Sequence, residues 1–378
     1  MTHPFSEAEM RRRHDALAAV MAERDVAHVV VRGADRSGSA IGWLTRWPVT
    51  REAIAVITPG ERDALFVGFY NHVPNATRIA TEADVSYIGE HPGVTAVSEI
   101  AARGAVGKRV GTIGPIGHRM HAALAAIADE VVDLSGAYTR LRQVKSAEEI
   151  DWIRHAARLT DAGVRALAEA ARPGVDERAL GDAIERAYVS AGATTHIHYL
   201  AATPMDAPQI SVPAQWPSDR PLVAGDVLTC EISANFWEYT AQALRTFAVA
   251  AEPSDLHREL HAVADAAFDA VAGRLRAGAP AADLFAASHV IEDAGFTIRD
   301  DLVHGYVGGY LPPVLGSASR QIAPVPEFTF EAGMTVVVQP NVVTSDERAG
   351  VQTGELLLVT ETGYERLHDL PRGLVRVG

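Results

Sequence analysis

Residues 223–233 read VAGDVLTCEIS, and residues 330–340 read FEAGMTVVVQP. In both stretches a glycine precedes an apolar run, and the sixth residue after that glycine is polar, Glu231 in the first and Gln339 in the second. The pattern predicts two equivalent buried strands. If the units that contain them face each other, Glu231 and Gln339 lie near a common pseudo-two-fold axis.

The segments ahead of these strands repeat in the same way. The stretch ARPGVDERALGDAIERAYVSAGA at 171–193 is echoed by LRAGAPAADLFAASHVIEDAGF at 275–296, and Gly174 and Gly278 stand 104 positions apart. Each half is therefore expected to run helix, glycine, helix and then strands. Chance similarity between two alanine-rich helices is the alternative interpretation.

The N-terminal part of the chain alternates between helix-period and strand-period segments. This rhythm predicts an α/β layered domain at residues 1–141. Ser146-Ala-Glu-Glu149 then matches a capping box, in which the serine hydroxyl caps a helix start and the glutamate reaches back. We expect this helix to open a second domain at residues 142–378.

The composition is that of a globular chain with an acidic surface. It has 378 residues, 48% of them hydrophobic, and a formal net charge of −14. Nucleic acids and anionic membranes are bound through clustered lysine and arginine, so neither is an expected partner. No apolar run reaches the ~18 residues of a membrane span, and the start lacks a signal-peptide core. Cys230 is the only cysteine, which excludes an internal disulfide and a cysteine metal cage, and we expect a cytoplasmic protein.

Several segments resemble the creatinase, aminopeptidase P and prolidase family, whose catalytic domain has the pita-bread fold. They are LRQVKSAEEIDWIRHAARLTDAG (141–163), WPSDRPLVAGDVLTCEISANFWEYTAQALRTFAV (216–249), VHGYVGG (303–309), the closing hairpin within 330–367, and GWLTRWPVTREA (42–53). The resemblance implies an α+β pita-bread domain with an internal pseudo-two-fold repeat. It also implies an N-terminal α/β domain with a ribonuclease H-like mixed sheet.

The metal ligands of the family's peptidases match this sequence poorly. Those enzymes hold two divalent metals with Asp, Asp, His, Glu and Glu, and the resemblance places these ligands, in order, on Glu231, Gln242, His304, Gln339 and Gly354. Of these five positions, only His304 has the same residue type as the family's ligand. Glu231 replaces an aspartate but keeps the negative charge, and the other three positions have lost it. Hard divalent ions are held largely by carboxylate charge, so we expect no metal and no other cofactor.

Two further histidines that the peptidases use around the scissile bond fall on Ala214 and Leu311. A peptidase that works through metal-activated water is therefore not expected. A single metal held by His196, His198, Glu231 and His304 is a minor alternative. Glu355, the neighbour of Gly354, does not replace the missing ligand, because adjacent strand residues point to opposite faces.

The candidate acid and base groups are His304, Glu231, His198 and His196. His196 and His198 lie in a strand-like run, HIHYLAA, so we expect both imidazoles on one face of the sheet. Histidine titrates near neutral pH and suits proton transfer, and a neighbouring carboxylate such as Glu231 raises its pKa. The alternative for the histidine pair is an ordinary hydrogen-bonded or surface role.

Polar residues near these groups are candidates for binding a substrate. Gln242 and Gln339 offer donors and acceptors for a neutral or zwitterionic ligand. Tyr239 is a further candidate donor, Arg245 is expected to support the site from behind, and Arg320 is a candidate from the loop after the His-Gly motif.

In creatinase-like enzymes, the N-terminal domain of one subunit completes the site of its partner. The resemblance places the corresponding loop at 42–51, where Arg46, Trp47 and Arg51 are candidates to clamp an anionic or planar group of the substrate. It implies a homodimer with composite sites. The alternative is a solvated arginine and a packed tryptophan.

These observations predict a metal-independent enzyme that acts on a small polar molecule. Hydrolysis of a C–N bond in a cyclic amidine, guanidino or amide compound is the leading hypothesis, and elimination, cyclisation or decarboxylation are close variants. A non-catalytic relative that binds a ligand or a protein is the competing class. A true metallopeptidase is the weakest alternative, and Cys230 is expected to be inert packing.

Overall fold

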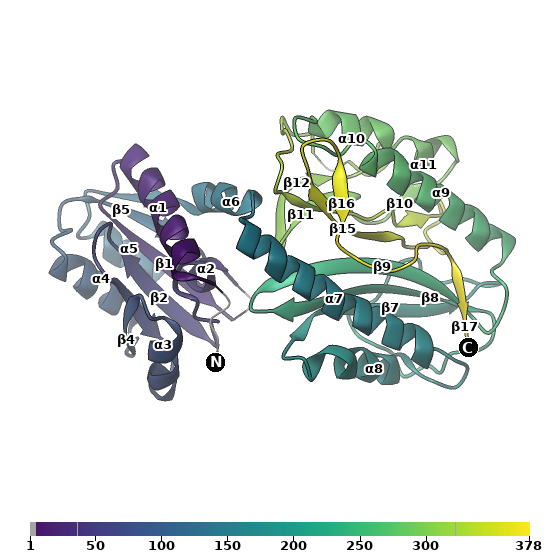
Figure 1. The fold of residues 1–378 in the computed structure, drawn as a ribbon, viewed down its shortest axis with the longest axis horizontal. Coiled ribbons are helices and arrows are strands. Elements are labelled where there is room, and N and C mark those ends of the chain that lie inside the picture. Colours follow the sequence, from purple (N-terminus) through teal and green to yellow (C-terminus); the bar gives the residue numbers. More distant parts are fainter. Residues whose placement is uncertain (1–4, 36, 322) are drawn as a thin grey trace. The chain divides into compact units, whose positions relative to one another are not determined.

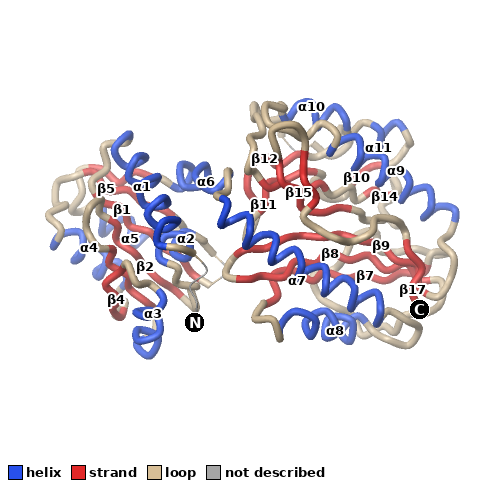
Figure 2. Tube along the Cα trace, in the orientation of Figure 1, coloured by secondary structure: helices blue, strands red, loops and turns tan. Residues whose placement is uncertain are grey.

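The computed structural model describes residues 5–35, 37–321 and 323–378, and the chain divides into two units, Met1–Arg142 and Gln143–Gly378. Figures 1 and 2 show each unit built around its own sheet with helices packed on it. Within the described residues, no helix combines the length and the apolar character needed to cross a membrane.

The first unit is centred on a mixed six-stranded sheet in the order β4-β3-β2-β1-β5-β6. The β1–β2 and β2–β3 pairs are antiparallel, whereas the β1–β5, β3–β4 and β5–β6 pairs are parallel. The strands are β1 (His28–Ala34), β2 (Glu52–Ile57), β3 (Asp63–Val67), β4 (Ala83–Tyr87), β5 (Arg109–Ile113) and β6 (Glu130–Asp133). This arrangement confirms the predicted α/β layer with a mixed sheet.

Helices cover the sheet of the first unit because its strands are apolar. Val30, Ile54 and Val56 of the sheet are fully buried in one cluster with Ile100 and Leu124 of two helices. The helical elements are α1 (Glu7–Glu23), α2 (Ala40–Thr45), the 3-10 turn η1 (Tyr70–His72), α3 (Val73–Ile79), α4 (Pro92–Ala102), α5 (His118–Ala125) and α6 (Ser135–Gln143), the last ending at the boundary between the units.

The second unit is built on a nine-stranded sheet. Its main path runs β12-β11-β13-β15-β9-β8-β7, with β16 paired to β15 and β17 paired to β9. The strands are β7 (Thr194–Pro204), β8 (Asp226–Phe236), β9 (Tyr239–Val249), β11 (Val303–Tyr306), β12 (Tyr310–Leu315), β13 (Thr335–Val338), β15 (Gly354–Val359), β16 (Tyr364–Arg366) and β17 (Val375–Val377), and a separate pair is formed by β10 (Thr297–Ile298) and β14 (Val342–Val343).

The strand order confirms the internal repeat. From the central β9–β15 pair, the path runs outward through β8 and β7 on one side and through β13 and β11 on the other. Gly225 and Gly333, the glycines ahead of β8 and β13, both have positive φ, 94° and 88°. Glycine tolerates this backbone conformation and other residues do so rarely, so the repeated glycines mark equivalent turns.

The helices of both halves pack on one face of this sheet. Those of the first half are α7 (Ala147–Ala170) and α8 (Glu177–Val189), and those of the second are α9 (Asp255–Ala272), α10 (Ala281–Ala287) and α11 (Val290–Asp293). The predicted capping box begins α7: Ser146 Oγ accepts from Glu149 N at 3.2 Å, and Ser146 N donates to Glu149 Oε2 at 3.0 Å.

Alternate residues of the strands supply the core beneath these helices. Cys230 and Ile232 of β8 and Ala243 of β9 are fully buried against α7 and α8, and Val338 of β13 and Leu357 of β15 are buried against α9 and its neighbours. Because side chains alternate along a strand, the residues between them point to the opposite, helix-free face. That face carries the polar groups described next.

Candidate active site

Glu231 and Gln242 lie side by side on the helix-free face of β8 and β9. Gln242 pairs across the strands with Ser233, so it shares a face with Glu231, and its Nε2 donates to Glu231 Oε1. Burial raises the pKa of Glu231 to about 7, and the charge of Asp300 adds to this, while the hydrogen bond from Gln242 opposes it. The Oε1 of Gln242 is buried and has no hydrogen-bond partner among the described residues.

His304 and Gln339 lie on the same face of the sheet, in the other half of the repeat. His304 is fully buried on β11, and Gln339 follows β13 directly. His304 Nε2 lies 3.3 Å from Gln339 Oε1, and its Nδ1 lies 3.1 Å from the backbone oxygen of Gly305. Burial lowers the pKa of His304 to about 4, against the raising effect of both hydrogen bonds. The imidazole is therefore neutral at neutral pH.

Asp300 and Asp301 belong to this cluster, although neither was predicted as a site residue from the sequence. Asp301 Oδ2 lies 3.8 Å from His304 Nε2, and the Tyr310 hydroxyl donates to Asp301 Oδ1 at 3.2 Å. The Tyr310 ring stacks on the imidazole of His304 with 3.9 Å between centroids. A signal was present in the sequence, because two consecutive aspartates stand three and four residues ahead of His304.

The two histidines of β7 do not share a face, so that prediction was wrong. A bulge between Thr195 and Ile197 inserts one extra residue, His196, and shifts the register of β7 on β8. The His196 ring lies 6.1 Å from that of Tyr306, which is itself 5.5 Å from His304. His198 points to the helix side, where its Nε2 is 3.9 Å from Glu185.

Tyr239 and Arg245 also point to the helix side, which corrects their assignment as substrate-binding residues. Both are an odd number of positions from Gln242 along β9. The Tyr239 hydroxyl donates to Glu149 at the start of α7 at 2.8 Å. Arg245 donates to Glu355 Oε2 at 2.6 Å and to the backbone oxygen of Gly354 at 2.8 Å, so it joins β9 to β15 behind the site.

The remaining predicted arginines lie elsewhere. Arg320 forms an ion pair with Glu347, which also pairs with Arg299. In the first unit, Arg46 and Trp47 are 5% and 2% exposed, so these two side chains are packing residues and do not offer a clamp. Arg51 lies on the surface of that unit, with its guanidinium carbon 5.3 Å from the centroid of the Phe69 ring.

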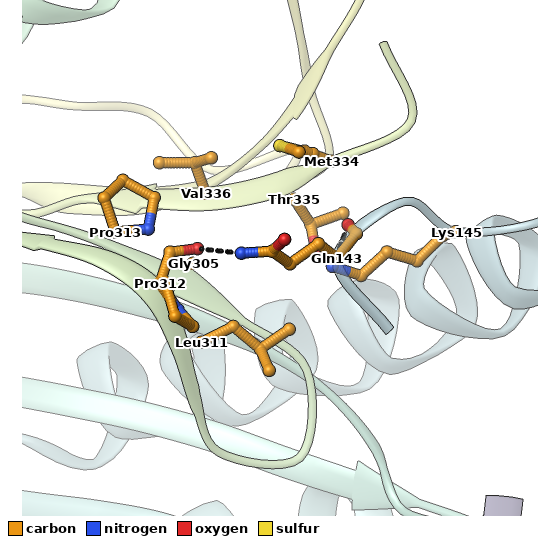
Figure 3. A pocket seen from close by; sticks show the side chains of 9 residues that line it. All are labelled: Gln143, Lys145, Gly305, Leu311, Pro312, Pro313, Met334, Thr335 and Val336. Carbon is orange, nitrogen blue, oxygen red and sulfur yellow. Dashed lines mark hydrogen bonds between the residues drawn. The ribbon is translucent and has the colours of Figure 1, made fainter. Parts of the chain in front are cut away.

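A surface depression lies at the edge of the sheet beside β11 and β12 (Figure 3). Its wall includes Gly305 and Pro312, and Gln143 closes one side by donating to the Pro312 backbone oxygen at 3.4 Å. The depression is too shallow to bury a ligand, so the polar cluster around His304 and Glu231 is the stronger candidate for a functional site.

The sequence model of metallopeptidase family M24 matches residues 151–361, more than half of the chain. The chain belongs to this family. An uncharacterized peptidase of Bacillus subtilis is 28% identical over 259 residues, which are 66% of this chain and 69% of that protein. A creatinase of a Bacillus species and the ectoine hydrolase of Halomonas elongata are each 27% identical and are matched over 61% and 60% of their lengths, covering 65% and 62% of this chain.

Solved structures with the same fold extend over both units. The X-Pro aminopeptidase of Thermotoga maritima superposes with a TM-score of 0.83 at 17% identity, covering 96% of this chain and 99% of that one. The Xaa-Pro dipeptidase of Bacillus anthracis gives 0.80 at 19%, covering 97% and 100%. These structures confirm the predicted M24 fold, and membership of the family supports a hydrolase.

The residues of this M24 chain do not fit the two-metal centre that the family name implies. The face offers two neutral amides, Gln242 and Gln339, where the resemblance places carboxylates. At Gly354 an added Cβ would lie 2.6 Å from the Val338 oxygen and 2.7 Å from Gln339 Cα, so no side chain fits. In the described part of the chain, no three His, Cys, Asp or Glu side chains are arranged to hold a metal ion.

Proposed function

We propose that this M24 protein hydrolyses a C–N bond of a small polar molecule without a two-metal centre. One observation carries the proposal. Metallopeptidases with this fold are expected to carry metal ligands on the helix-free face of the sheet, and in this chain that face holds Glu231, His304 and the amides of Gln242 and Gln339. Cyclic amidine, guanidino and amide compounds are the proposed substrate class. The similarity to a creatinase and an ectoine hydrolase supports this choice.

The roles of the residues follow from their protonation. Glu231, whose pKa is about 7, exists near neutral pH in both forms and suits a base that takes a proton from water. His304 is neutral and buried, so it orients a reacting group by hydrogen bonding. Gln242 Oε1 is an unused acceptor that an N–H group of the substrate would satisfy, and His196 extends the polar face towards solvent.

Two further parts of the proposal concern the oligomeric state and the cellular location. We propose a homodimer, in which Arg51 is the candidate that the N-terminal unit offers to the partner's site. We also propose a cytoplasmic location, which the single cysteine supports.

A ligand-binding protein without turnover is the second candidate. The unpartnered oxygen of Gln242 favours a bound ligand, and it does so whether or not a reaction follows.

The test is a turnover screen on purified protein treated with EDTA. Candidate amidines, guanidino compounds and amides are incubated with the protein and followed by mass spectrometry, with Glu231→Gln and His304→Ala beside the wild type. Loss of a general base costs about 10²–10⁴ in rate, and we expect a loss of this size for Glu231→Gln. His198→Ala is the matched control, because its imidazole lies on the opposite face and should leave turnover unchanged.

Two results would separate the alternatives. Tight binding without turnover would favour the ligand-binding protein. Activity that EDTA abolishes and that returns with about two metal ions per chain would contradict the proposal and indicate a metallopeptidase.

A further inference from the structure

Two buried amide side chains, Asn341 and Gln352, lie opposite each other beyond the ends of β13 and β15. The backbone N–H of Val351 donates to the oxygen of Val342 at 3.0 Å, which continues the antiparallel ladder of these two strands in the same register. Asn341 and Gln352 are the next pair of this ladder. They form a non-hydrogen-bonded pair, because bonded and non-bonded pairs alternate along such a ladder. Side chains approach most closely in non-bonded pairs, so the two amides are neighbours.

These two amides belong to the helix-free face that carries the polar cluster. Asn341 is two positions beyond Gln339, so these side chains share a face and lie about 7 Å apart along the strand direction. Thr353, the residue after Gln352, points to the other face, where its hydroxyl donates to Asp265 of α9 at 3.4 Å. The amides of Asn341 and Gln352 therefore form a second polar row beside the cluster.

Neighbouring hydrogen bonds hold both residues. Asn341 Oδ1 accepts from the backbone N–H groups of Arg299 at 2.9 Å and of Asp300 at 3.1 Å, which identifies Nδ2 as the other end of the amide. The Thr246 hydroxyl accepts from the backbone N–H of Gln352 and donates to its backbone oxygen, both at 2.8 Å. The amide of Asn341 and the backbone of Gln352 are therefore fixed, and both side chains are buried.

Three buried polar atoms of this face lack a hydrogen-bond partner among the residues that the structure describes. One is a donor, Asn341 Nδ2, and two are acceptors, the Oε1 atoms of Gln352 and Gln242. Buried polar groups in folded proteins nearly always have a partner, because an unpaired one has given up its hydrogen bonds to water. A bound molecule with matching donors and acceptors would supply all three.

The donor and the acceptor that lie opposite each other select the chemistry of that molecule. A guanidinium or amidinium group offers only donors, so it would leave Asn341 Nδ2 unpaired. A carboxylate offers only acceptors, so it would leave Gln352 Oε1 unpaired. A primary carboxamide or a ring amide presents a carbonyl oxygen and an N–H side by side, and this edge serves both residues.

We propose that Asn341 and Gln352 form a subsite that binds an amide edge of the substrate, either a primary carboxamide or a ring amide. Asn341 Nδ2 donates to the carbonyl oxygen of this edge, and Gln352 Oε1 accepts from its N–H. The inference rests on the proposed function for the statement that the bound molecule is the substrate. It narrows the proposed substrates to molecules that carry such an edge.

Binding of three small probes tests the subsite without any turnover. 2-Pyrrolidinone is a ring amide, N-methyl-2-pyrrolidinone lacks its N–H, and 2-iminopyrrolidine is an amidinium ion with donors only. Dissociation constants for the whole chain are measured by saturation-transfer difference NMR at pH 8. We expect wild type to bind 2-pyrrolidinone about tenfold more tightly than its N-methyl form, which leaves Gln352 Oε1 unpaired.

Two substitutions test one amide each. Gln352→Met keeps the length of the side chain but removes the acceptor, so 2-pyrrolidinone and its N-methyl form should bind about equally. Asn341→Asp still accepts from the two backbone N–H groups, which favour its carboxylate form, but it no longer donates. It should bind 2-pyrrolidinone about tenfold more weakly and 2-iminopyrrolidine more tightly than wild type. Asn71→Asp, at an exposed position of η1, is the matched control and should change neither.

Three results would overturn the inference. They are no binding of 2-pyrrolidinone to wild type, a preference for the N–H form that survives Gln352→Met, and equal effects of Asn341→Asp and Asn71→Asp. If one variant fails to fold, the wild-type preference and the other variant still decide.

The turnover screen separates this inference from the proposed function. Turnover of a candidate compound combined with any of those three results would remove the amide subsite and leave the hydrolase. The expected binding pattern without turnover of any candidate would support the subsite and count against hydrolysis.

Discussion

The two halves of the second unit share one strand plan but place their acids differently. In the first half, Glu231 lies within β8, where it is buried and accepts a hydrogen bond from Gln242. In the second half, the equivalent position holds Gln339, and the acid, Asp301, comes from the loop ahead of β11 and contacts Gln339 from the side. The comparison teaches that the repeat fixes where polar groups meet, while the residue that supplies the charge can come from a strand or from a loop.

The largest expected effect comes from breaking the ion pair that joins the halves. Glu355 is fully buried and bonds both Arg245 and Arg366. Glu355→Gln leaves buried arginine charge uncompensated, and we expect the free energy of unfolding to fall by about 3–5 kcal/mol in urea titrations.

Glu365→Gln is the matched control on the same hairpin. Its pair with Arg154 is half exposed and worth about 0–1 kcal/mol. Similar losses in both variants would show that the Glu355 pair does not hold the halves together.

The second prediction concerns Glu231→Gln, which gives the first half a glutamine at the position where the second half has Gln339. Burial raises the pKa of Glu231 to about 7 in the folded state, so its carboxylate form destabilises the fold, and its contribution to stability falls as pH rises from about 4.5 to about 7. The shift corresponds to about 3 kcal/mol. His304, whose pKa burial lowers to about 4, contributes an opposite change over nearly the same range, so the Glu231 contribution is measured as the difference in unfolding free energy between wild type and Glu231→Gln. This difference should change by about 3 kcal/mol across the range, whereas exposed Glu361→Gln should keep the wild-type pH dependence. A parallel pH dependence in wild type and Glu231→Gln would refute the assignment.

The third prediction concerns Gly354 of the second half, where the surrounding backbone leaves no room for a side chain. An alanine methyl at Gly354 overlaps the Val338 oxygen, and we expect Gly354→Ala to cost about 1–3 kcal/mol in thermal or urea unfolding. At Gly181, in α8 of the first half, an added Cβ meets only the His198 ring at 3.7 Å. Gly181→Ala should therefore stabilise the helix by up to about 1 kcal/mol. The comparison fails if both substitutions shift stability in the same direction.

Much of the fold could be predicted from the sequence, because repeated glycines, the capping box at Ser146 and the apolar runs each leave a local signature. The site was harder, because it depends on which way single side chains point. One inserted residue at His196 sends His198 to the other face, and no residue pattern in HIHYLAA reveals that bulge. The odd spacing of Arg245 from Gln242 was a usable signal, since alternation on a strand already separates them. The two aspartates ahead of His304 were also a signal, but the contact of Asp301 with Gln339 depends on how the loop folds back.

The alternation of residues along the central strands has a practical consequence for engineering. Positions 231, 242 and 356 face the polar side, whereas 230, 243 and 355 face the helices. A mutant library restricted to the polar-side positions would vary substrate choice while leaving the core contacts and the Arg245–Glu355 link untouched. A protein arranged in this way can acquire new specificities by small steps without first being made more stable.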